Sequence, residues 1–367
     1  MNKVRLGSIA SLKTGPFGTQ FSAKEYTETG VPVINVKNIG YGEVIENDLD
    51  YISEETKNRL SEHILMQGDI VFGRKGSVDR HAYISENYEG WVQGSDCIRV
   101  RCDDEINKKY ISHYLKLNHI KKMVNNAAVG STMASMNTDI LRDIEILLPE
   151  LKVQNKIERI VSLIEAKICL NRKINDNLHS QMCLFYEHLM SKAMSKQIQG
   201  NFVCAKELTE VITGKEDANF SSPDGLYKFF TCSNIPLQCN EYAFDSSSIL
   251  IAGNGDFNVK HYSGKFNAYQ RTYVLTPPSE YYALLYMASL YRINSFKSKS
   301  SGSIVKFITK GDVENIPLFM PTGTSILKEL NKLIALKEHN SFENEELSRL
   351  RNWLLPMLMN GQAAIED

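Results

Sequence analysis

The sequence lacks the features of a membrane or secreted protein. None of its 367 residues belongs to an uninterrupted apolar run of about 18 residues, so we expect no membrane-spanning helix. The opening residues Met1–Arg5 lack the apolar stretch of a signal peptide. The seven cysteines form no CxxC pair. We therefore expect a cytoplasmic protein with free thiols and neither a disulfide framework nor a zinc site.

Charge of neither sign is in excess, because 42 Lys and Arg residues balance 43 Asp and Glu residues to a net charge of -1. The whole-chain charge therefore gives no sign of a nucleic-acid partner, although it can conceal local asymmetry. The hydrophobic share of 43% excludes a disordered chain. At about 100–200 residues per domain, the length predicts two or three domains.

The motifs of several enzyme classes are also missing. The Pro277-Pro278 pair has Thr276 before it and Ser279 after it, whereas adenine methyltransferases need an aromatic ring after the prolines to stack on a flipped base. No GxxxxGK[ST] phosphate loop and no HExxH metal motif occurs. Glu55-Thr56-Lys57 has the carboxylate–X–lysine spacing of nuclease active sites, but no Pro-Asp pair accompanies it as in those enzymes. We therefore expect no catalysis, no metal and no cofactor in this chain.

An internal repeat organises the sequence. Residues 128–149 match residues 300–321 without a gap, and Gly130-Ser131 falls on Gly302-Ser303. Three shorter matches occur in the same order along both halves: Thr14-Gly15 with Thr213-Gly214, Asn38-Ile39 with Asn234-Ile235, and Gly68–Gly76 with Ser247–Gly255. Four ordered matches predict a chain built from two related units.

Each unit has the pattern of a mixed α/β domain. Short apolar or alternating runs bounded by Gly, Pro or Asp predict strands, and longer runs with helical spacing predict one helix per unit. In the first unit the strands are expected at Val31–Ile39, Asp69–Phe72, Cys97–Val100 and Glu145–Leu148, and the helix at Ile111–Val124. In the second they are expected at Lys228–Cys232, Ile249–Ala252 and Thr272–Leu275, with a helix at Tyr281–Tyr291.

A long helix is expected after each unit. Apolar residues recur every three or four positions for about 35 residues from Ile157, and again between Leu327 and Leu358. Since so narrow a stripe needs a partner, the two helices are expected to pair antiparallel as a coiled-coil-like rod; the alternative is that each packs on its own domain. The predicted domains are 1–150 and 199–321, and the predicted long helices lie at 151–198 and 322–367.

Local charge is uneven despite the neutral total. Residues 106–138 carry five lysines and no Asp or Glu, and residues 256–310 carry eight Lys or Arg against Asp256 and Glu280. Two basic stretches suit a polyanion. A merely solvated basic face is the alternative, but the repeated position beside Gly/Ser loops favours DNA contact.

The loops of both units carry side chains suited to DNA. Arg and Lys can bind guanine edges or phosphates, amides can read adenine, and hydroxyl and backbone N–H groups can bind phosphate. The candidate DNA-binding residues of the first unit are Lys13, Thr14, Gln20, Lys37, Asn38, Arg74, Lys75, Ser77, Ser131 and Thr132. Those of the second unit are Thr213, Lys215, Ser233, Asn234, Asn254, Lys260, Arg271, Ser301 and Ser303.

With these features, the sequence resembles the specificity (S) subunit of type I restriction-modification systems. Four stretches carry the resemblance: Val4–Gly15, Gln67–Phe72, Gly130–Ile157 and the closing helix Leu347–Gly361. The resemblance covers nearly the whole chain. The second unit departs more, since Cys204–Leu208 matches the opening stretch only loosely.

The resemblance implies a non-catalytic subunit with two inverted target-recognition domains. Each domain would read one half of a bipartite DNA target in the major groove, and the helices would set the spacer between the halves. Two methyltransferase subunits and two restriction motor/nuclease subunits would be its partners. Those partners would supply S-adenosylmethionine, ATP and Mg²⁺.

Two other functions stay open at this point. The chain could be a DNA methyltransferase or nuclease whose active site follows an unfamiliar motif. It could instead be a coiled-coil adaptor whose α/β domains bind proteins. Methylation or cleavage by the purified chain without partners would favour the first, and an absent or salt-independent DNA interaction of the assembled complex would favour the second.

Overall fold

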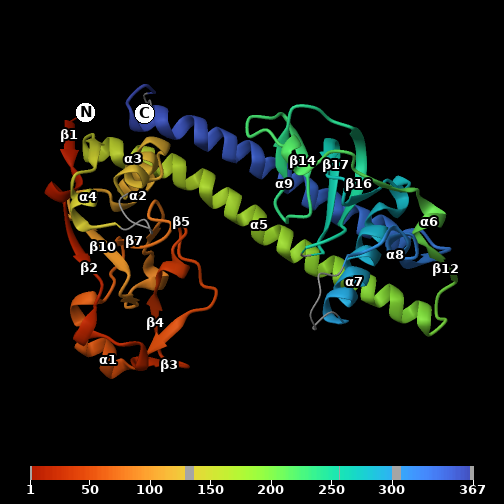
Figure 1. The fold of residues 1–367 in the computed structure, drawn as a ribbon, viewed down its shortest axis with the longest axis horizontal. Coiled ribbons are helices and arrows are strands. Elements are labelled where there is room, and N and C mark those ends of the chain that lie inside the picture. Colours follow the sequence, from red (N-terminus) through yellow and green to blue (C-terminus); the bar gives the residue numbers. More distant parts are fainter. Residues whose placement is uncertain (1, 129–135, 256, 300–306, 364–367) are drawn as a thin grey trace. The chain divides into compact units, whose positions relative to one another are not determined.

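The computed structural model describes residues 2–128, 136–255, 257–299 and 307–363 (Figure 1). The chain divides into two compact units, which are described separately. Unit 1 comprises Met1–Lys167 and Leu347–Asp367, and unit 2 comprises Ile168–Glu346. Two long helices, α5 (Leu151–Met194) and α9 (Ser325–Met359), each contribute to both units.

The described residues of unit 1 form three sheets. A two-stranded sheet pairs β1 (Asn2–Arg5) with β11 (Glu145–Leu148). The five-stranded sheet has the order β2 (Ala10–Thr14), β10 (Cys97–Cys102), β7 (Ile70–Gly73), β8 (His81–Tyr83) and β5 (Tyr41–Gly42). The four-stranded sheet has the order β3 (Tyr26–Thr27), β6 (Asp50–Ile52), β4 (Val31–Ile34) and β9 (Val92–Gln93).

The helices of unit 1 are α1 (Glu54–Arg59), α2 (Lys108–Leu115), α3 (Asn118–Ala128) and α4 (Thr138–Arg142). The prediction of a single helix over Ile111–Val124 is wrong, because α2 ends at Leu115 and α3 begins at Asn118. Leu115 and Leu117 are both buried. Side chains two residues apart point to different sides of a helix, so a break lets both enter the core.

The strand predicted over Val31–Ile39 is also shorter than expected, because β4 ends at Ile34. Asn35 then begins a short 3₁₀ turn at Val36–Asn38, and its backbone N–H donates to the Asn38 side-chain oxygen at 3.2 Å. This reciprocal cap satisfies backbone groups that a strand would have paired with a neighbour.

Unit 2 is built on a two-stranded and a six-stranded sheet. The first pairs β12 (Gly200–Cys204) with β19 (Pro317–Pro321). The second has the order β13 (Val211–Thr213), β18 (Thr272–Leu275), β16 (Phe244–Ala252), β17 (Val259–Ala268), β14 (Tyr227–Phe230) and β15 (Leu237–Cys239). Its helices are α6 (Ala205–Leu208), α7 (Tyr282–Lys299) and α8 (Lys310–Glu314).

The two units share one topology, which confirms the predicted repeat. The order β2-β10-β7-β8 in unit 1 equals β13-β18-β16-β17 in unit 2, and every pair in both sets is antiparallel. In addition, a fifth strand runs parallel to the last of these four in each unit, β5 beside β8 and β14 beside β17. The short α4 and α8 precede the closing strands β11 and β19.

In each unit, the larger sheet, a shorter helix and both long helices contribute to one core. The core of unit 1 joins Phe72 and Ile98 of the sheet, Tyr110 of α2, Val161 of α5 and Leu355 of α9. The core of unit 2 joins Ile249 of the sheet, Leu284 of α7, Met182 of α5 and Leu330 of α9.

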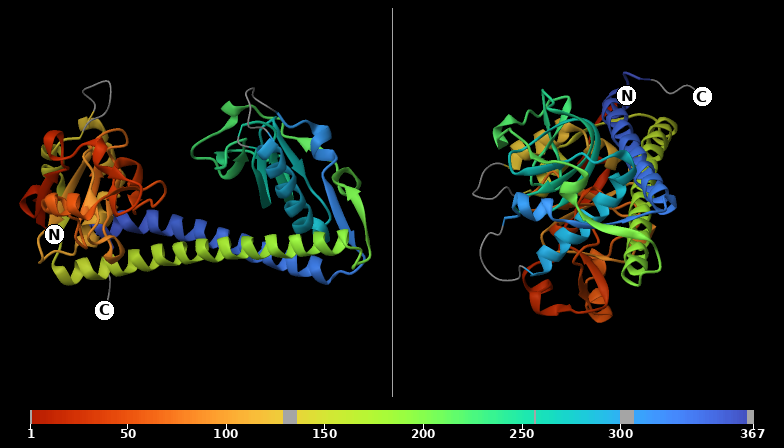
Figure 2. Two further views of the ribbon diagram at one scale, coloured as in Figure 1. Left: turned by 90° about the horizontal axis from the view of Figure 1, so that it is seen from below. Right: turned by 90° about the vertical axis from the view of Figure 1, so that its right-hand side faces the viewer.

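The long helices α5 and α9 pack side by side (Figure 2), which confirms the predicted pairing. Within unit 2 they run antiparallel, because contacts move down α9 as they move up α5. The Asn171 side chain, 1% exposed, donates to Glu343 Oε2 at 2.6 Å, and one turn later Asn175 bonds with Asn340 at 2.9 Å. Among the described residues, no helix is long and apolar enough to cross a membrane.

Candidate nucleic-acid interface

Three loop segments of unit 1 meet at one end of the five-stranded sheet. The Gly15 N–H, just after β2, donates to the Cys97 carbonyl at 2.8 Å. The Arg74 N–H, just after β7, donates to the Asp96 carbonyl at 2.7 Å, and the Arg74 carbonyl accepts from the Met136 N–H at 2.8 Å. We call this arrangement the unit 1 loop junction.

The same hydrogen bonds form a unit 2 loop junction. The Gly214 N–H donates to the Thr272 carbonyl at 3.1 Å. The Gly253 N–H donates to the Arg271 carbonyl at 2.8 Å, and the Gly253 carbonyl accepts from the Ile308 N–H at 2.8 Å. The repeat therefore extends from the sheets to the backbone geometry of the loops that carry the candidate residues.

Glycine is required at one position of each junction. A Cβ atom on Gly15 would lie 1.9 Å from the Gly94 carbonyl oxygen, and one on Gly214 would lie 2.0 Å from the Ala268 carbonyl oxygen. Both obstacles are backbone, which a side-chain rotation cannot remove. This close approach explains why Thr-Gly recurs in the two copies of the sequence repeat.

In unit 1 the junction presents one free guanidinium and one paired lysine. No side-chain hydrogen bond or ion pair of Arg74 occurs within the described part of the chain, and this residue is half-buried. The neighbouring Lys75 Nζ lies 3.0 Å from Asp96 Oδ1, and Ser77 is exposed. Arg74 is therefore the candidate of this loop with an uncommitted charged side chain.

The other two lysine candidates of unit 1, Lys13 and Lys37, form ion pairs. Lys13 pairs with Glu62. Lys37 Nζ lies 2.9 Å from Asp48 and 3.0 Å from Asp50, and the Asp48 carboxylate raises the pKa of Lys37. These pairings lower the positive potential of the surface near both lysines.

The remaining side chains of this group differ in exposure. Asn38 is completely buried, and its amide donates to the carbonyls of Ile45 and Asn47 at 3.0 and 3.1 Å. This burial favours a structural role for Asn38. Thr14 is half-buried beside Gly15, and Gln20 is exposed.

In unit 2, exposed polar side chains surround the junction. Thr213, Lys215, Ser233, Asn234 and Arg271 are exposed, and Asn254 is half-buried. The segment before Ser233 is held to the junction, because the Cys232 carbonyl accepts from Asn258 at 2.7 Å and the Cys232 thiol donates to the Arg271 carbonyl at 3.5 Å. The structure thus brings most of the unit 2 candidates into one neighbourhood.

Lys260 is the most constrained cation of this set. Its Nζ donates to the Thr231 carbonyl at 3.0 Å. Burial lowers the pKa of Lys260 to about 8, because desolvation penalises the charged amine. The candidates Ser131, Thr132, Ser301 and Ser303 lie outside the described residues.

The basic stretch at 106–138 is less basic in space than in sequence. Lys108 pairs with Asp104 at 2.9 Å, Lys109 lies 3.6 Å from Glu158, and Lys116 lies 2.8 Å from Glu165. Glu158 and Glu165 belong to α5, which packs against the helices of unit 1. The charge count along the sequence missed these partners because they come from another element.

Sequence reasoning also missed an aromatic and cationic group in unit 1. The Lys121 Nζ lies 4.2 Å from the centroid of the Tyr41 ring, and the Arg80 guanidinium carbon lies 5.2 Å from it. These residues come from three separate segments, and none stands out by itself. The position of Lys121 in a basic stretch was the only available signal.

The described residues contain no cluster of three or more His, Cys, Asp or Glu side chains that could hold a metal ion. The candidate interface consists of two equivalent loop junctions that carry cationic, amide and hydroxyl groups. Such groups suit hydrogen bonding to phosphates and base edges.

A model of the type I restriction modification DNA specificity domain matches this chain twice, over residues 1–180 and 200–349. The chain belongs to the family of type I restriction-modification specificity subunits. The two matches fall on the two halves of the repeat. The specificity-subunit fold is therefore present in both units, each with its own loop junction.

Two curated relatives are specificity subunits. The type I restriction enzyme EcoDI specificity subunit of Escherichia coli is 40% identical over 167 residues, which cover 44% of this chain and 38% of that protein. The MjaVIII specificity subunit of Methanocaldococcus jannaschii is 21% identical over 188 residues, or 48% of this chain and 42% of that protein. Each match thus spans about two fifths of the relative.

A solved structure shares the fold over the full chain. The crystal structure of the type I restriction-modification S subunit from M. genitalium matches with a TM-score of 0.60 and 17% sequence identity. The match covers 100% of this chain and 96% of that one. At this identity the likeness concerns the arrangement of α/β domains and long helices.

Proposed function

We propose that the chain is the DNA-reading component of a type I restriction-modification complex and that each unit contacts one half of a bipartite target. The carrying observation is the equivalence of the two loop junctions, which reproduce the same backbone hydrogen bonds around Gly15 and Gly214. Two equivalent frames with different side chains suit two half-sites of different sequence.

The proposed division of labour follows the domains. Residues 1–150 and 199–321 are the target-recognition domains, and residues 151–198 and 322–367 form the spacer helices. The buried Asn171 and its bond to Glu343 support a fixed register between the helices, because a polar layer in a helix pair disfavours sliding. A fixed register would in turn fix the length of the spacer between the half-sites.

The chemistry is assigned to partners. We propose that two methyltransferase subunits and two restriction motor/nuclease subunits join this chain and supply S-adenosylmethionine, ATP and Mg²⁺. The long helices offer surface for such partners, since large apolar side chains on them are exposed. Examples are Leu163, Leu170 and Leu184 on α5, and Phe342 and Trp353 on α9.

The first test concerns Arg74. Replacing Arg74 with Ala in the complete complex should weaken recognition of the first half-site by about 1–3 kcal/mol if the guanidinium contacts a base. Methylome sequencing of cells carrying the variant should then show relaxed bases in one half of the motif only. Arg5→Ala is the matched control, because Arg5 is an exposed arginine that pairs with Asp143 in unit 1.

The outcome separates the proposal from its alternatives. A motif that stays unchanged in Arg74→Ala removes this residue from the interface. Relaxation in both halves would contradict the assignment of one half-site to each unit. Methylation or cleavage of DNA by the purified chain without partners would replace the proposal with an enzymatic one.

A further inference from the structure

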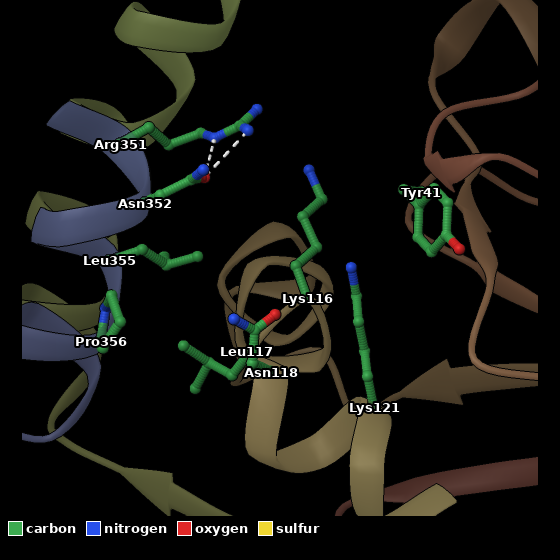
Figure 3. Close-up of a pocket in the computed structure, with 9 residues that line it drawn as sticks. All are labelled: Tyr41, Lys116, Leu117, Asn118, Lys121, Arg351, Asn352, Leu355 and Pro356. Atoms are coloured by element: carbon green, nitrogen blue, oxygen red, sulfur yellow. Dashed lines mark hydrogen bonds between the residues drawn. The ribbon is translucent and has the colours of Figure 1, made fainter. Parts of the chain in front are cut away.

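A cavity of about 360 Å³ in unit 1 lies outside the loop junction. It is bounded by the α2–α3 connection, by β5 and by the last turns of α9 (Figure 3). Part of its lining is apolar, because Leu117, Leu355 and Pro356 contribute to it (Figure 3). Its walls carry Tyr41, Lys116, Asn118, Lys121, Arg351 and Asn352.

Three cations face this cavity, and none of the described residues that line it is acidic. Figure 3 shows Lys116, Lys121 and Arg351 extending into the same space from two sides. Glu165 lies beside two of these cations, since its Oε1 is 2.8 Å from Lys116 Nζ and 3.9 Å from Arg351 Nη1. The charged side chains in the described lining of the cavity are therefore cationic, and their carboxylate neighbours lie outside that lining.

Lys121 is the cation without a carboxylate partner among the described residues, since its Nζ lies over the Tyr41 ring. Burial lowers the pKa of Lys121, and the nearby Lys116 and Arg351 lower it too, against the opposing effects of Asp79 and Glu43. An anion in the cavity would relieve the repulsion among these three cations.

The start of α3 adds backbone donors to the same wall. The Leu117 carbonyl accepts the first helical hydrogen bond, from the Lys121 N–H at 3.0 Å, so Leu117 occupies the N-cap position. A leucine side chain has no atom that can cap the following N–H groups. The first turn of α3 lines the cavity through Asn118 and Lys121, so the positive end of the α3 dipole lies at its edge beside the side-chain cations.

We propose that this cavity binds a phosphate group, carried either by a free nucleotide or by a nucleic-acid backbone. A phosphate presents several oxygens to several donors at once, which suits three cations that approach from two sides. The volume lies within the range of ligand sites, about 300–1,000 Å³. The inference goes beyond the proposed function, because none of the candidate DNA-reading residues lines this cavity.

The test uses the full chain and isothermal titration with inorganic phosphate, adenosine 5′-monophosphate, adenosine and a short DNA duplex. The Lys121→Ala/Arg351→Ala double variant removes two cations and keeps Lys116, which neutralises Glu165. Lys122→Ala is the matched control, because Lys122 is an exposed lysine of α3 that does not line the cavity.

We expect the double variant to bind inorganic phosphate and the mononucleotide at least tenfold more weakly than the wild type and the control. Adenosine, which has no phosphate, should not bind. If only the duplex binds, and only the double variant weakens that binding, the phosphate is that of a DNA backbone. Equal affinity of the double variant and the control for every probe would overturn the proposal.

Two further measurements keep the result clear. An unchanged thermal unfolding midpoint shows that the double variant is folded. If the double variant is not folded, the single variants Lys121→Gln and Lys121→Arg are measured in its place. The Lys121→Arg variant keeps the positive charge and should retain phosphate binding. Methylome sequencing of the same variants separates this site from the reading of the target. Weaker binding of a phosphate-bearing probe with an unchanged motif supports the cavity as a separate site, whereas an unchanged affinity for every probe disproves it whatever the motif.

Discussion

Units 1 and 2 share a common frame, which consists of four antiparallel strands and a loop junction, and they differ in the elements attached to it. Both have the same antiparallel four-strand order and the same hydrogen bonds at the loop junction. Unit 1 adds the four-stranded sheet β3-β6-β4-β9 with its own small core around Val33 and Ile52. Unit 2 instead extends β16 and β17 to 9 and 10 residues. The frame positions the loops, and the additions change the surface around them.

The units also differ in the balance of charge near their junctions. In unit 1, Lys13, Lys37 and Lys75 all pair with carboxylates. In unit 2, the exposed Arg271 and Lys215 have no ion pair within the described part of the chain. We infer that DNA contact by unit 2 depends more on attraction between charges, whereas unit 1 depends more on Arg74 and on polar groups.

The largest expected effect comes from glycine variants that disrupt the loop junctions of the common frame. Gly15→Ala places a Cβ against the Gly94 carbonyl and should destabilise unit 1 by about 1–3 kcal/mol or more. Gly214→Ala should do the same in unit 2 through Ala268. Urea denaturation measures the loss, and methylome sequencing should show a different half of the motif affected by each variant.

Gly323→Ala is the control for these variants. Nothing lies within 4 Å of a Cβ atom at that position, and its backbone does not require glycine. It should leave both stability and motif close to those of the wild type. Equal tolerance at all three positions would show that the loop junctions do not need the close backbone approach.

A smaller effect tests the difference in charge between the units. Arg271→Ala should weaken recognition of the second half-site by about 1–3 kcal/mol if the guanidinium contacts a base. Lys75→Ala should cost less in the first half, because Asp96 already neutralises this lysine. Binding of the assembled complex to duplex DNA at several salt concentrations compares the two losses. A larger loss for Lys75→Ala would reverse the comparison.

The smallest expected effect concerns the pH dependence of stability. The pKa of Lys260 is about 8 in the folded chain and near 10.5 when unfolded. Between these values the unfolded chain binds more protons, so the free energy of unfolding of the wild type should rise with pH relative to that of Lys260→Met. Urea denaturation at pH 7 and pH 9.5 measures the difference, with the exposed Lys215→Met as a control. A difference that stays constant with pH for Lys260→Met would contradict the burial of this charge.

Much of the fold could be predicted from the sequence because the repeat and the long helices produce recognisable local sequence patterns. The ungapped match of 128–149 with 300–321 places Met136 on Ile308, and both donate the same hydrogen bond to their junctions. The apolar spacing from Ile157 predicted a long helix, which the structure shows as α5 over Leu151–Met194. Periodicity reports such elements because burial of one face recurs every turn.

The candidate site was less predictable, for physical reasons that particular residues show. Lys37 and Arg74 are both cations in loops, yet only Lys37 meets carboxylates, from Asp48 and Asp50. Asn38 looked suited to reading bases, but it is buried as part of a local cap. The partner of a side chain depends on contacts across the fold, which sequence spacing does not report.

The duplication, the long helices and the glycine positions at the loop junctions follow from sequence patterns, because they depend on local periodicity and local steric demands. Which cations are neutralised and which remain available depends instead on packing between distant elements. Glu165 meets Lys116 and Arg351 only after α5, α2 and α9 pack together. Electrostatic interactions act through space, so they are settled by packing rather than by order along the chain.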